Sequence, residues 1–244
     1  MRRWLLVTAW ALLGFASAPA LADPPADHAY PLDGIAREID KRGPLHCPEV
    51  KLVDYRGEVV RWQVPGKIFE GMREHLVTFE RIATEVGNEI YGRAPTRIVQ
   101  LGTFNCRRMR AEPGWLSEHA LGNAVDVAGF DFGPLPKGAT LPAGLDRAFG
   151  NGFEVRVGRH WGKHAGHAAV HARFLETLIV RLIEREDDKR DAFRVLLGPG
   201  YPGHQDHFHL DMAPFHMVQI IADGEPIERR ARGRAASGDK DLQL

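Results

Sequence analysis

The sequence has little of what marks a specialised class of protein. Only two of its 244 residues are cysteine, aromatic residues make up 9%, and 32 basic side chains are balanced by 32 acidic ones. Because no net positive charge draws the chain toward phosphate backbones, we expect no nucleic acid among its partners. With 44% hydrophobic and 26% charged residues, the composition is that of an ordinary globular protein, long enough to bury a core.

The apolar run near the N-terminus is too short to span a bilayer. It extends from Trp4 to Phe15, whereas a membrane-spanning helix needs about 20 apolar residues. Two arginines precede it and the small residues APALA at 18–22 follow it, which is typical of a signal peptide and its cleavage site. We therefore expect 1–22 to be a signal peptide and the protein to be periplasmic or otherwise exported, with no stable membrane insertion after cleavage. A retained N-terminal anchor is the alternative.

Export changes the interpretation of the two cysteines. In an oxidising compartment, Cys47 and Cys106 favour a disulfide over two free thiols. They lie far apart in the sequence rather than in a C-x-x-C pair, so a redox motif is not predicted.

Helical and alternating patterns are mixed along the chain without a regular β-α-β rhythm. Apolar residues recur every three or four positions over 68–90 and 170–183, which predicts two amphipathic helices. A short helix is also expected over 32–41. Strands are predicted at 97–101, 153–157, 193–197 and 206–212. Together these patterns indicate an α+β fold.

The composition also shifts along the chain. The segment 23–31 holds three prolines and no apolar periodicity, so we expect an N-terminal arm over 23–44. One domain is expected over 45–223. From 224 to 244 the chain is polar and charged, which predicts a disordered tail.

Two short segments concentrate the chemistry, SEHALGNAVDVA at 117–128 and HQDHFHLD at 204–211. The alternation of a strand places His207, His209 and Asp211 on one face. By the same alternation, Asp126 shares a strand face with Ala124 and Ala128, whose small side chains leave room for something to approach its carboxylate. An imidazole pair beside a carboxylate is a donor set that zinc selects, and an open fourth position is typical of catalytic zinc. Surface histidines on an edge strand are the alternative, but the two segments together favour a metal site.

A second group of histidines competes with this site. Its members follow one another at steps of four, three and four, as on one side of a helix: His160, His164, His167 and His171. Gly158, Gly162 and Gly166 make a continuous helix doubtful, and neither a carboxylate nor a cysteine joins the group. We therefore interpret it as a feature facing solvent or the rim of a cleft.

The first segment contains the pattern S-x-H-x-x-G-x-A-x-D, and with the later H-x-H it resembles the zinc D-Ala-D-Ala peptidases, the lysostaphin-type enzymes and the hedgehog amino-terminal domain. More specifically, 45–215 resemble the bacterial extensin-like C-terminal domain family, through NCR at 105–107 and the two segments above. The H-x-x-H-x-H spacing at 204–209 is also similar to that of penicillin-insensitive murein endopeptidases. The chain departs from the extensin-like pattern in having only two cysteines and few family features over 131–152.

The resemblance implies an α+β domain whose small antiparallel sheet carries a zinc site and is flanked by helices. One zinc ion per chain is then held by His119, Asp126 and His209. The same resemblance makes His207 the general base or a group that stabilises the transition state. Arg107 would stabilise the developing oxyanion, with a surface salt bridge as the alternative role.

Three further residues receive supporting roles. His204 is expected to bind substrate or to orient His207, and Asp211 to accept a hydrogen bond from a ligating imidazole. Ser117 is expected to position its loop rather than react, because no base is paired with it in the sequence.

The resemblance implies an exported zinc peptidase that cleaves peptidoglycan stem peptides or cross-links, with endopeptidase favoured over carboxypeptidase action. One alternative is a cell-wall-binding module that keeps the metal site with little or no catalysis. Another is a metal-binding protein that uses the 160–171 histidines. The oligomeric state is left open.

Overall fold

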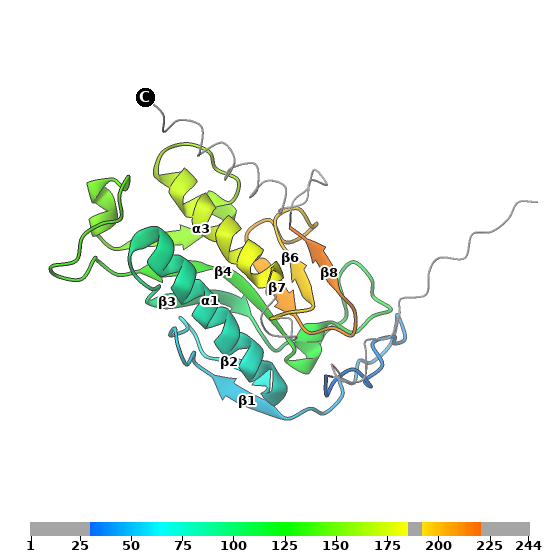
Figure 1. Cartoon of the computed structure of the whole chain (residues 1–244). Helices are drawn as coiled ribbons and strands as arrows, with labels where there is room; N and C mark the ends of the chain where they lie inside the picture. Colours follow the sequence, from blue (N-terminus) through cyan, green and yellow to red (C-terminus); the bar gives the residue numbers. More distant parts are fainter. Residues whose placement is uncertain (1–29, 185–191, 221–244) are drawn as a thin grey trace, which may run out of the picture.

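The fold is organised around strand β4 (Ala124–Phe132) of the computed structural model, which describes residues 30–184 and 192–220 (Figure 1). One edge of β4 pairs with β3 (Arg97–Gly102). The other edge pairs first with β7 (Phe208–Asp211) and then with β5 (Phe153–Arg156). Strand β6 (Val195–Leu197) is antiparallel to β7 and parallel to β8 (Met217–Gln219), which completes a six-stranded sheet.

The remaining elements surround this sheet. A separate two-stranded sheet consists of β1 (Leu52–Tyr55) and β2 (Gly66–Phe69). The α-helices are α1 (Arg73–Tyr91), α2 (Val157–His160) and α3 (Gly166–Ile183). Short 3-10 helices are η2 (Glu70–Met72), η3 (Glu118–Leu121) and η4 (Arg147–Gly150). No helix among the described residues is long and apolar enough to cross a membrane.

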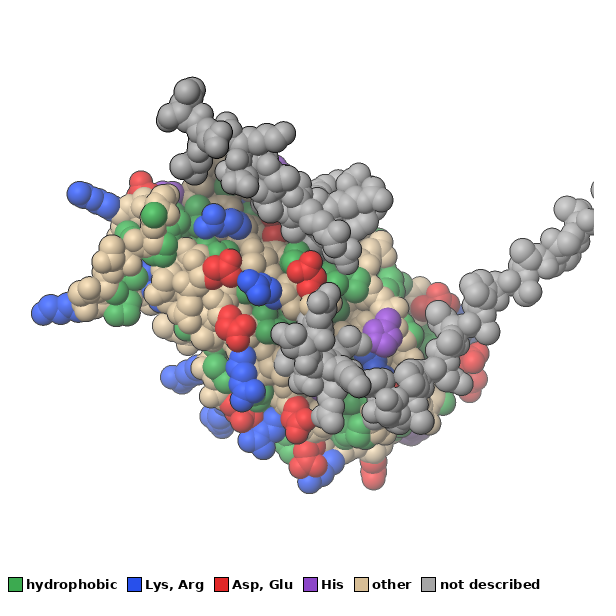
Figure 2. Space-filling view, in the orientation of Figure 1, with side chains coloured by type: hydrophobic (Ala, Val, Ile, Leu, Met, Phe, Trp, Pro, Cys, Tyr) green, Lys and Arg blue, Asp and Glu red, His purple; other side chains and the backbone are tan. Residues whose placement is uncertain are grey.

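Helices α1 and α3 lie side by side across one face of the six-stranded sheet (Figure 1). Phe130 of β4 packs against Phe79 of α1 and Phe174 of α3, with ring centroids 6.1 and 5.1 Å apart. Figure 2 shows acidic and basic side chains interspersed over the outer side of this layer. One domain of mixed helix and small, mainly antiparallel sheets confirms the predicted α+β class.

A β-bulge in β4 changes which side chains of this strand face the core. Val99 of β3 pairs with Gly129 and Gln100 pairs with Val127, so Ala128 is the extra residue. Because one extra residue reverses the alternation of the strand, Val127 and Phe130 both enter the core although three positions separate them. Asp126 therefore faces away from the helices.

Two expected helices differ from those observed. The first long helix begins at Arg73 rather than at Ile68, because Ile68 pairs with Val53 in the β1–β2 sheet. The short helix expected over 32–41 is absent: after a turn, the amide of Ile39 donates to the carbonyl of Gly114. The expected signal peptide (1–22) and tail (224–244) lie outside the described residues.

Candidate metal centre

Strand register brings Asp126 and His209 together. In the antiparallel pair of β4 and β7, the two residues lie directly opposite each other. Phe208 and Leu210 enter the core on the other side of β7, so the alternation predicted for this strand is observed. The side chains of His209 and Asp126 thus lie on the sheet face opposite α1 and α3.

His119 reaches the same point from η3, between β3 and β4. Gly122 ends this short helix with a positive φ of 62° and returns the chain to β4. A side chain there would be strained by the backbone conformation, and its Cβ would lie 2.7 Å from the amide nitrogen of Phe69. The glycine of the sequence motif is therefore what allows His119 and Asp126 to face each other.

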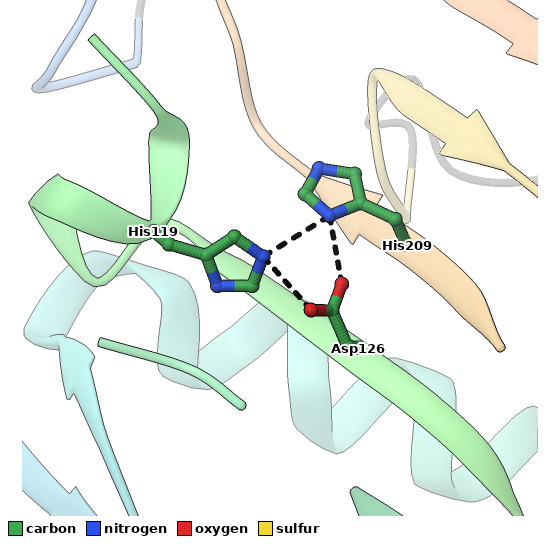
Figure 3. A group of neighbouring side chains, drawn as sticks. All are labelled: His119, Asp126 and His209. Carbon is green, nitrogen blue, oxygen red and sulfur yellow. Dashed lines mark hydrogen bonds and ion pairs between the residues drawn. The ribbon is translucent and has the colours of Figure 1, made fainter. Parts of the chain in front are cut away.

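The three side chains converge on one point (Figure 3). One potential ligand atom from each of His119, Asp126 and His209 lies within 4.8 Å of the others. His119 Nε2 is 3.2 Å from Asp126 Oδ2, and His209 Nδ1 is 2.9 Å from Asp126 Oδ1. A tetrahedral zinc ion with bonds of about 2.0–2.1 Å requires its ligand atoms to lie about 3.3 Å apart. The observed distances are close to this value, with His119 and His209 each nearest a different oxygen of Asp126.

The outer nitrogen of each imidazole is held by an acceptor. His119 Nδ1 donates to the carbonyl oxygen of Thr103 over 2.6 Å, and His209 Nε2 donates to Asp211 Oδ2 over 2.7 Å. In the neutral rings, the inner nitrogens then present lone pairs to each other and to the Asp126 carboxylate. A cation between them satisfies all three groups, so the donor set and its outer partners fit a metal ion.

The electrostatics of the site favour positive charge. Burial alone would raise the pKa of the Asp126 carboxyl, but hydrogen bonds with His119 and His209 hold that pKa far below its usual range. Burial alone would lower the pKa of His209, but Asp126 and Asp211 outweigh it and raise the pKa. A proton or a metal ion is therefore drawn to the same point.

His207 and His204 lie at the more exposed side of this centre. His207 Nε2 is 3.6 Å from Asp126 Oδ1, while its Nδ1 contacts Asp206 Oδ1 at 2.8 Å. The His204 ring lies 4.9 Å from that of His207 and 5.5 Å from that of His209, between ring centroids. Burial and then the neighbouring imidazoles lower the pKa of His204, which favours its neutral form.

Arg107 and Ser117 lie on the segment that leads to His119. Burial lowers the pKa of the Arg107 guanidinium, and the nearby negative charge of Asp126 opposes this effect. The two ends of this segment are hydrogen-bonded, because the backbone carbonyl of Arg107 accepts from the amide of Ser117 at 3.2 Å. Ser117 is buried and immediately precedes η3.

A disulfide holds this segment at its other end. Cys47 and Cys106 are bonded, with their Cα atoms 5.9 Å apart. This confirms the predicted pairing. The bond ties the chain before β1 to the residue next to Arg107.

The 160–171 histidines form no single stripe. Positive φ angles at Gly162 and Gly166 separate α2 from α3. His160 and His171 are buried with ring centroids 4.6 Å apart. Of the two expected positions, facing solvent or at the rim of a cleft, the first is therefore wrong for these two. His167 is exposed. Among the described residues, the metal-compatible group is that of His119, Asp126 and His209.

Several contacts of the centre escape sequence reasoning. The acceptor for His119 is a backbone carbonyl, that of Thr103, which no side-chain motif can indicate. Asp206, the partner of His207, lies inside the H-x-x-H-x-H segment, and its adjacency to His207 was an available signal. The ion pairs of Asp33 and Arg37, described below, join residues far apart in the sequence.

Comparison with known proteins gives a match to the part of the chain that carries His119 and Asp126. Residues 36–137 match the family model described as extensin-like protein C-terminus. This match supports the resemblance to the extensin-like family, and it includes Arg107, His119 and Asp126. The matched range ends before His207 and His209. No curated protein and no solved structure gave a significant match to the chain.

Proposed function

We propose that this chain is an exported zinc-dependent peptidase that cleaves peptidoglycan stem peptides or cross-links, as an endopeptidase. The observation that carries the proposal is the convergence of His119, Asp126 and His209, each imidazole with its outer nitrogen already bound to an acceptor. Three protein ligands, with the fourth position left for water or substrate, are typical of catalytic rather than structural zinc.

Zinc, when bound, supplies a coordinated water with a pKa lowered toward ~7 and polarises a carbonyl group. The side chain proposed to accept the proton of the attacking water is His207. Because its Nδ1 is held by Asp206, its Nε2 points toward the Asp126 carboxylate, 3.6 Å away. An imidazole in this place can accept a proton during attack and return it to the leaving amine.

Arg107 is the proposed partner of the substrate carbonyl. Its guanidinium interacts electrostatically with Asp126, which places positive charge beside the centre. Negative charge that develops on a carbonyl oxygen during hydrolysis would be stabilised by that cation. His204 adds a neutral imidazole next to His207, suited to hydrogen-bond a peptide group of the substrate.

The choice of peptidoglycan rests on the resemblance and on the expected export. An exported peptidase with the S-x-H-x-x-G-x-A-x-D pattern would meet this polymer in its own compartment. The preference for endopeptidase action rests on the spacing of His204, His207 and His209.

The direct test is incubation of the purified protein with intact peptidoglycan, followed by mass analysis of the released fragments. We expect cross-linked fragments to be cleaved, a chelator to stop cleavage, and added zinc to restore it. Asp126→Asn should abolish cleavage, while the matched control His167→Ala, at an exposed histidine, should retain it. Zinc binding without any cleavage would replace the peptidase with a binding module, and activity that survives both the chelator and Asp126→Asn would overturn the metal mechanism.

A further inference from the structure

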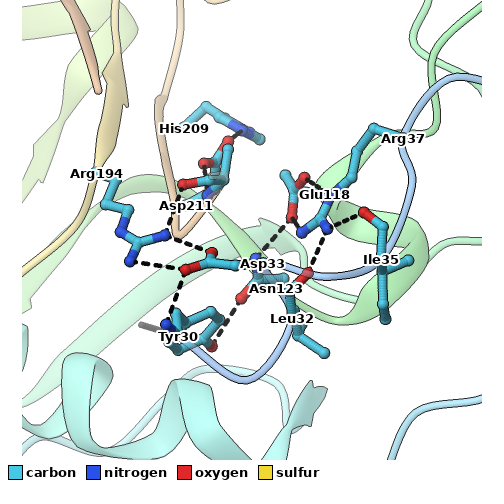
Figure 4. A network of polar contacts seen from close by, with 11 residues as sticks. Tyr30, Leu32, Asp33, Ile35, Arg37, Glu118, Asn123, Arg194, His209 and Asp211 are labelled. Carbon is cyan, nitrogen blue, oxygen red and sulfur yellow. Dashed lines mark hydrogen bonds and ion pairs between the residues drawn. The ribbon is translucent and has the colours of Figure 1, made fainter. Parts of the chain in front are cut away.

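The segment from Tyr30 to Arg37 connects the two parts of the chain that carry the histidine ligands. Figure 4 shows it between η3, which holds His119, and the end of β7, which holds His209. These three segments are joined by two arginine–carboxylate pairs, Arg37–Glu118 and Asp33–Arg194, and by the side-chain amide of Asn123. We call residues 30–37 the brace.

One end of the brace holds η3. Arg37 is 5% exposed, and its Nε and Nη2 donate to the two carboxylate oxygens of Glu118 at 2.8 and 3.1 Å. Its third nitrogen, Nη1, donates to the carbonyls of Leu32 and Ile35 in the brace itself. Because Glu118 directly precedes His119, this two-point contact fixes the segment that presents the His119 ring.

The other end holds β7. Asp33 accepts from Arg194 Nη1 and Nη2 at 2.5 and 3.2 Å. The amide of Arg194 donates to the carbonyl of Asp211, and its guanidinium donates to the carbonyl of Ala213. Asp211 is the residue that holds His209 Nε2, so this end of the brace supports the outer partner of the second ligand.

Asn123 closes the connection between the two ends. Its Oδ1 accepts from the hydroxyl of Tyr30 at 2.8 Å, and its Nδ2 donates to Glu118 Oε2 at 2.6 Å. Its carbonyl accepts from the amide of Met212, just beyond β7. Tyr30, Asn123 and Glu118 are all buried, so these contacts are shielded from water.

This arrangement matters more for His119 than for its partners. Asp126 and His209 are fixed by a pair of sheet strands, whereas His119 stands on a 3-10 helix of four residues outside the sheet. A buried arginine–carboxylate pair adds little net stability relative to apolar side chains, but its geometry is restrictive. The Arg37–Glu118 pair therefore contributes mainly by fixing the position of η3 and of the His119 ring.

We propose that the brace is a positioning element for the metal ligands: by linking η3 to the end of β7, it preorganises His119 and His209 around the ion. This inference rests on the metal site of the proposed function. Because linkage is reciprocal, metal binding also strengthens the docking of the brace.

The test compares metal affinity in paired variants that leave no buried charge without its partner. In Arg37→Met/Glu118→Gln the η3 end is released, and in Asp33→Asn/Arg194→Met the β7 end is released. Zinc affinity is measured by competition with a chromophoric chelator, and ligand geometry by the visible absorption of the cobalt-substituted protein. We expect each pair to weaken zinc binding by about 10-fold or more, as found for residues that orient metal ligands, and to change the cobalt spectrum.

The matched control is Arg156→Met/Asp131→Asn. Arg156 also donates to two carbonyls, those of Phe130 and Val155, and to one carboxylate, that of Asp131, but at the far end of β4. Since distant sites rarely couple, its zinc affinity should stay within about twofold of the unmodified protein. A loss of affinity in the control equal to that in the brace variants would assign the effect to stability alone and overturn the proposal.

If a brace variant fails to fold, a measurement on the unmodified chain still tests the proposal. Hydrogen exchange at the amides of Asp33, Ile35 and Ile39, which are bonded within or beside the brace, should slow when zinc is added. Unchanged exchange, or folded brace variants that bind zinc as tightly as the unmodified protein, would overturn the brace. An unmodified protein that binds no zinc would instead overturn the proposed function, and the brace with it.

Discussion

His119 Nε2 and His209 Nδ1 lie 3.2 Å apart although the two residues are 90 positions apart in the chain. Each ring is turned so that its other nitrogen donates to a fixed acceptor, the Thr103 carbonyl for His119 and the Asp211 carboxylate for His209. Two inner nitrogens this close need a proton or a metal ion between them, because two lone pairs would repel each other. This relationship is the physical basis of the predictions on metal binding.

The first prediction concerns metal content. The unmodified protein should bind one zinc ion, and His119→Ala or Asp126→Asn should reduce the bound zinc far below one per chain, since two protein ligands hold zinc poorly. At zinc concentrations about 100 times the Kd, binding should add about 2.7 kcal/mol to the free energy of unfolding. Metal analysis and thermal unfolding, each with and without a chelator, measure both effects. If Asp126→Asn keeps a full complement of zinc, the assigned ligand set is wrong.

The second prediction separates proton transfer from metal binding. His207→Ala should retain one zinc per chain and lower the turnover of peptidoglycan fragments by about 10²–10⁴-fold, because it removes a general base. His209→Ala should lose zinc and activity together. His209 lies on β7 and His207 just before it, two positions away. Both rings approach Asp126, so one can ligate while the other addresses the substrate. Full activity in zinc-loaded His207→Ala would move the base to His204.

The third prediction concerns the disulfide of Cys47 and Cys106, whose sequence separation is 59. A cross-link closing a loop of that length restricts the unfolded chain and contributes about 4 kcal/mol in the chain-entropy model. Cys47→Ser/Cys106→Ser should therefore unfold at lower denaturant concentration, which a urea titration measures. Because the bond ends next to Arg107, we also expect the variant to show weaker substrate binding. A double variant as stable as the unmodified protein would contradict the prediction.

Parts of the site were predictable from local patterns, whereas the set of three metal ligands came from the resemblance to the zinc D-Ala-D-Ala peptidases. Alternation alone places His207 and His209 on the side away from Phe208 and Leu210. In the structure Phe208 and Leu210 enter the core, and both histidines approach Asp126. The small residue Gly122 marks the turn between His119 and Asp126. The α+β class also follows from local patterns, since the helices over 73–91 and 166–183 carry regular apolar faces.

What could not be predicted depends on contacts between distant residues. Arg37 and Glu118 are 81 positions apart, and Asp33 and Arg194 are 161 apart, so no spacing rule links them. Other distant contacts explain why no helix forms over 32–41. The carbonyl of Arg37 accepts from the amide of Leu116, and the amide of Ile39 donates to the carbonyl of Gly114. These distant backbone partners override the local helical pattern.

The last prediction concerns pH and the buried pair of His160 and His171. Burial lowers the pKa of His171 to about 4, with further contributions from the neighbouring imidazoles of His160 and His167. Its Nδ1 lies 2.9 Å from the hydroxyl of Tyr91 on α1, and the pKa of His160 is lowered as well, again mainly by burial. The folded protein therefore keeps both rings neutral in a region where the unfolded chain takes up protons.

Since the unfolded pKa of histidine is ~6.5, the unfolded state binds more protons between about pH 6.5 and pH 4, and stability falls as the pH falls through that window. The slope from His171 alone approaches about 1.4 kcal/mol per pH unit. Urea titrations at several pH values measure it, and His171→Gln should flatten the slope while lowering stability at pH 7, where the buried contact with Tyr91 is changed. His46→Gln, at an exposed position that is not among the groups lowering the pKa of His171, should leave the slope nearly unchanged. A slope in His171→Gln equal to that of the unmodified protein would assign the acid sensitivity to other groups, with His160 the first to examine.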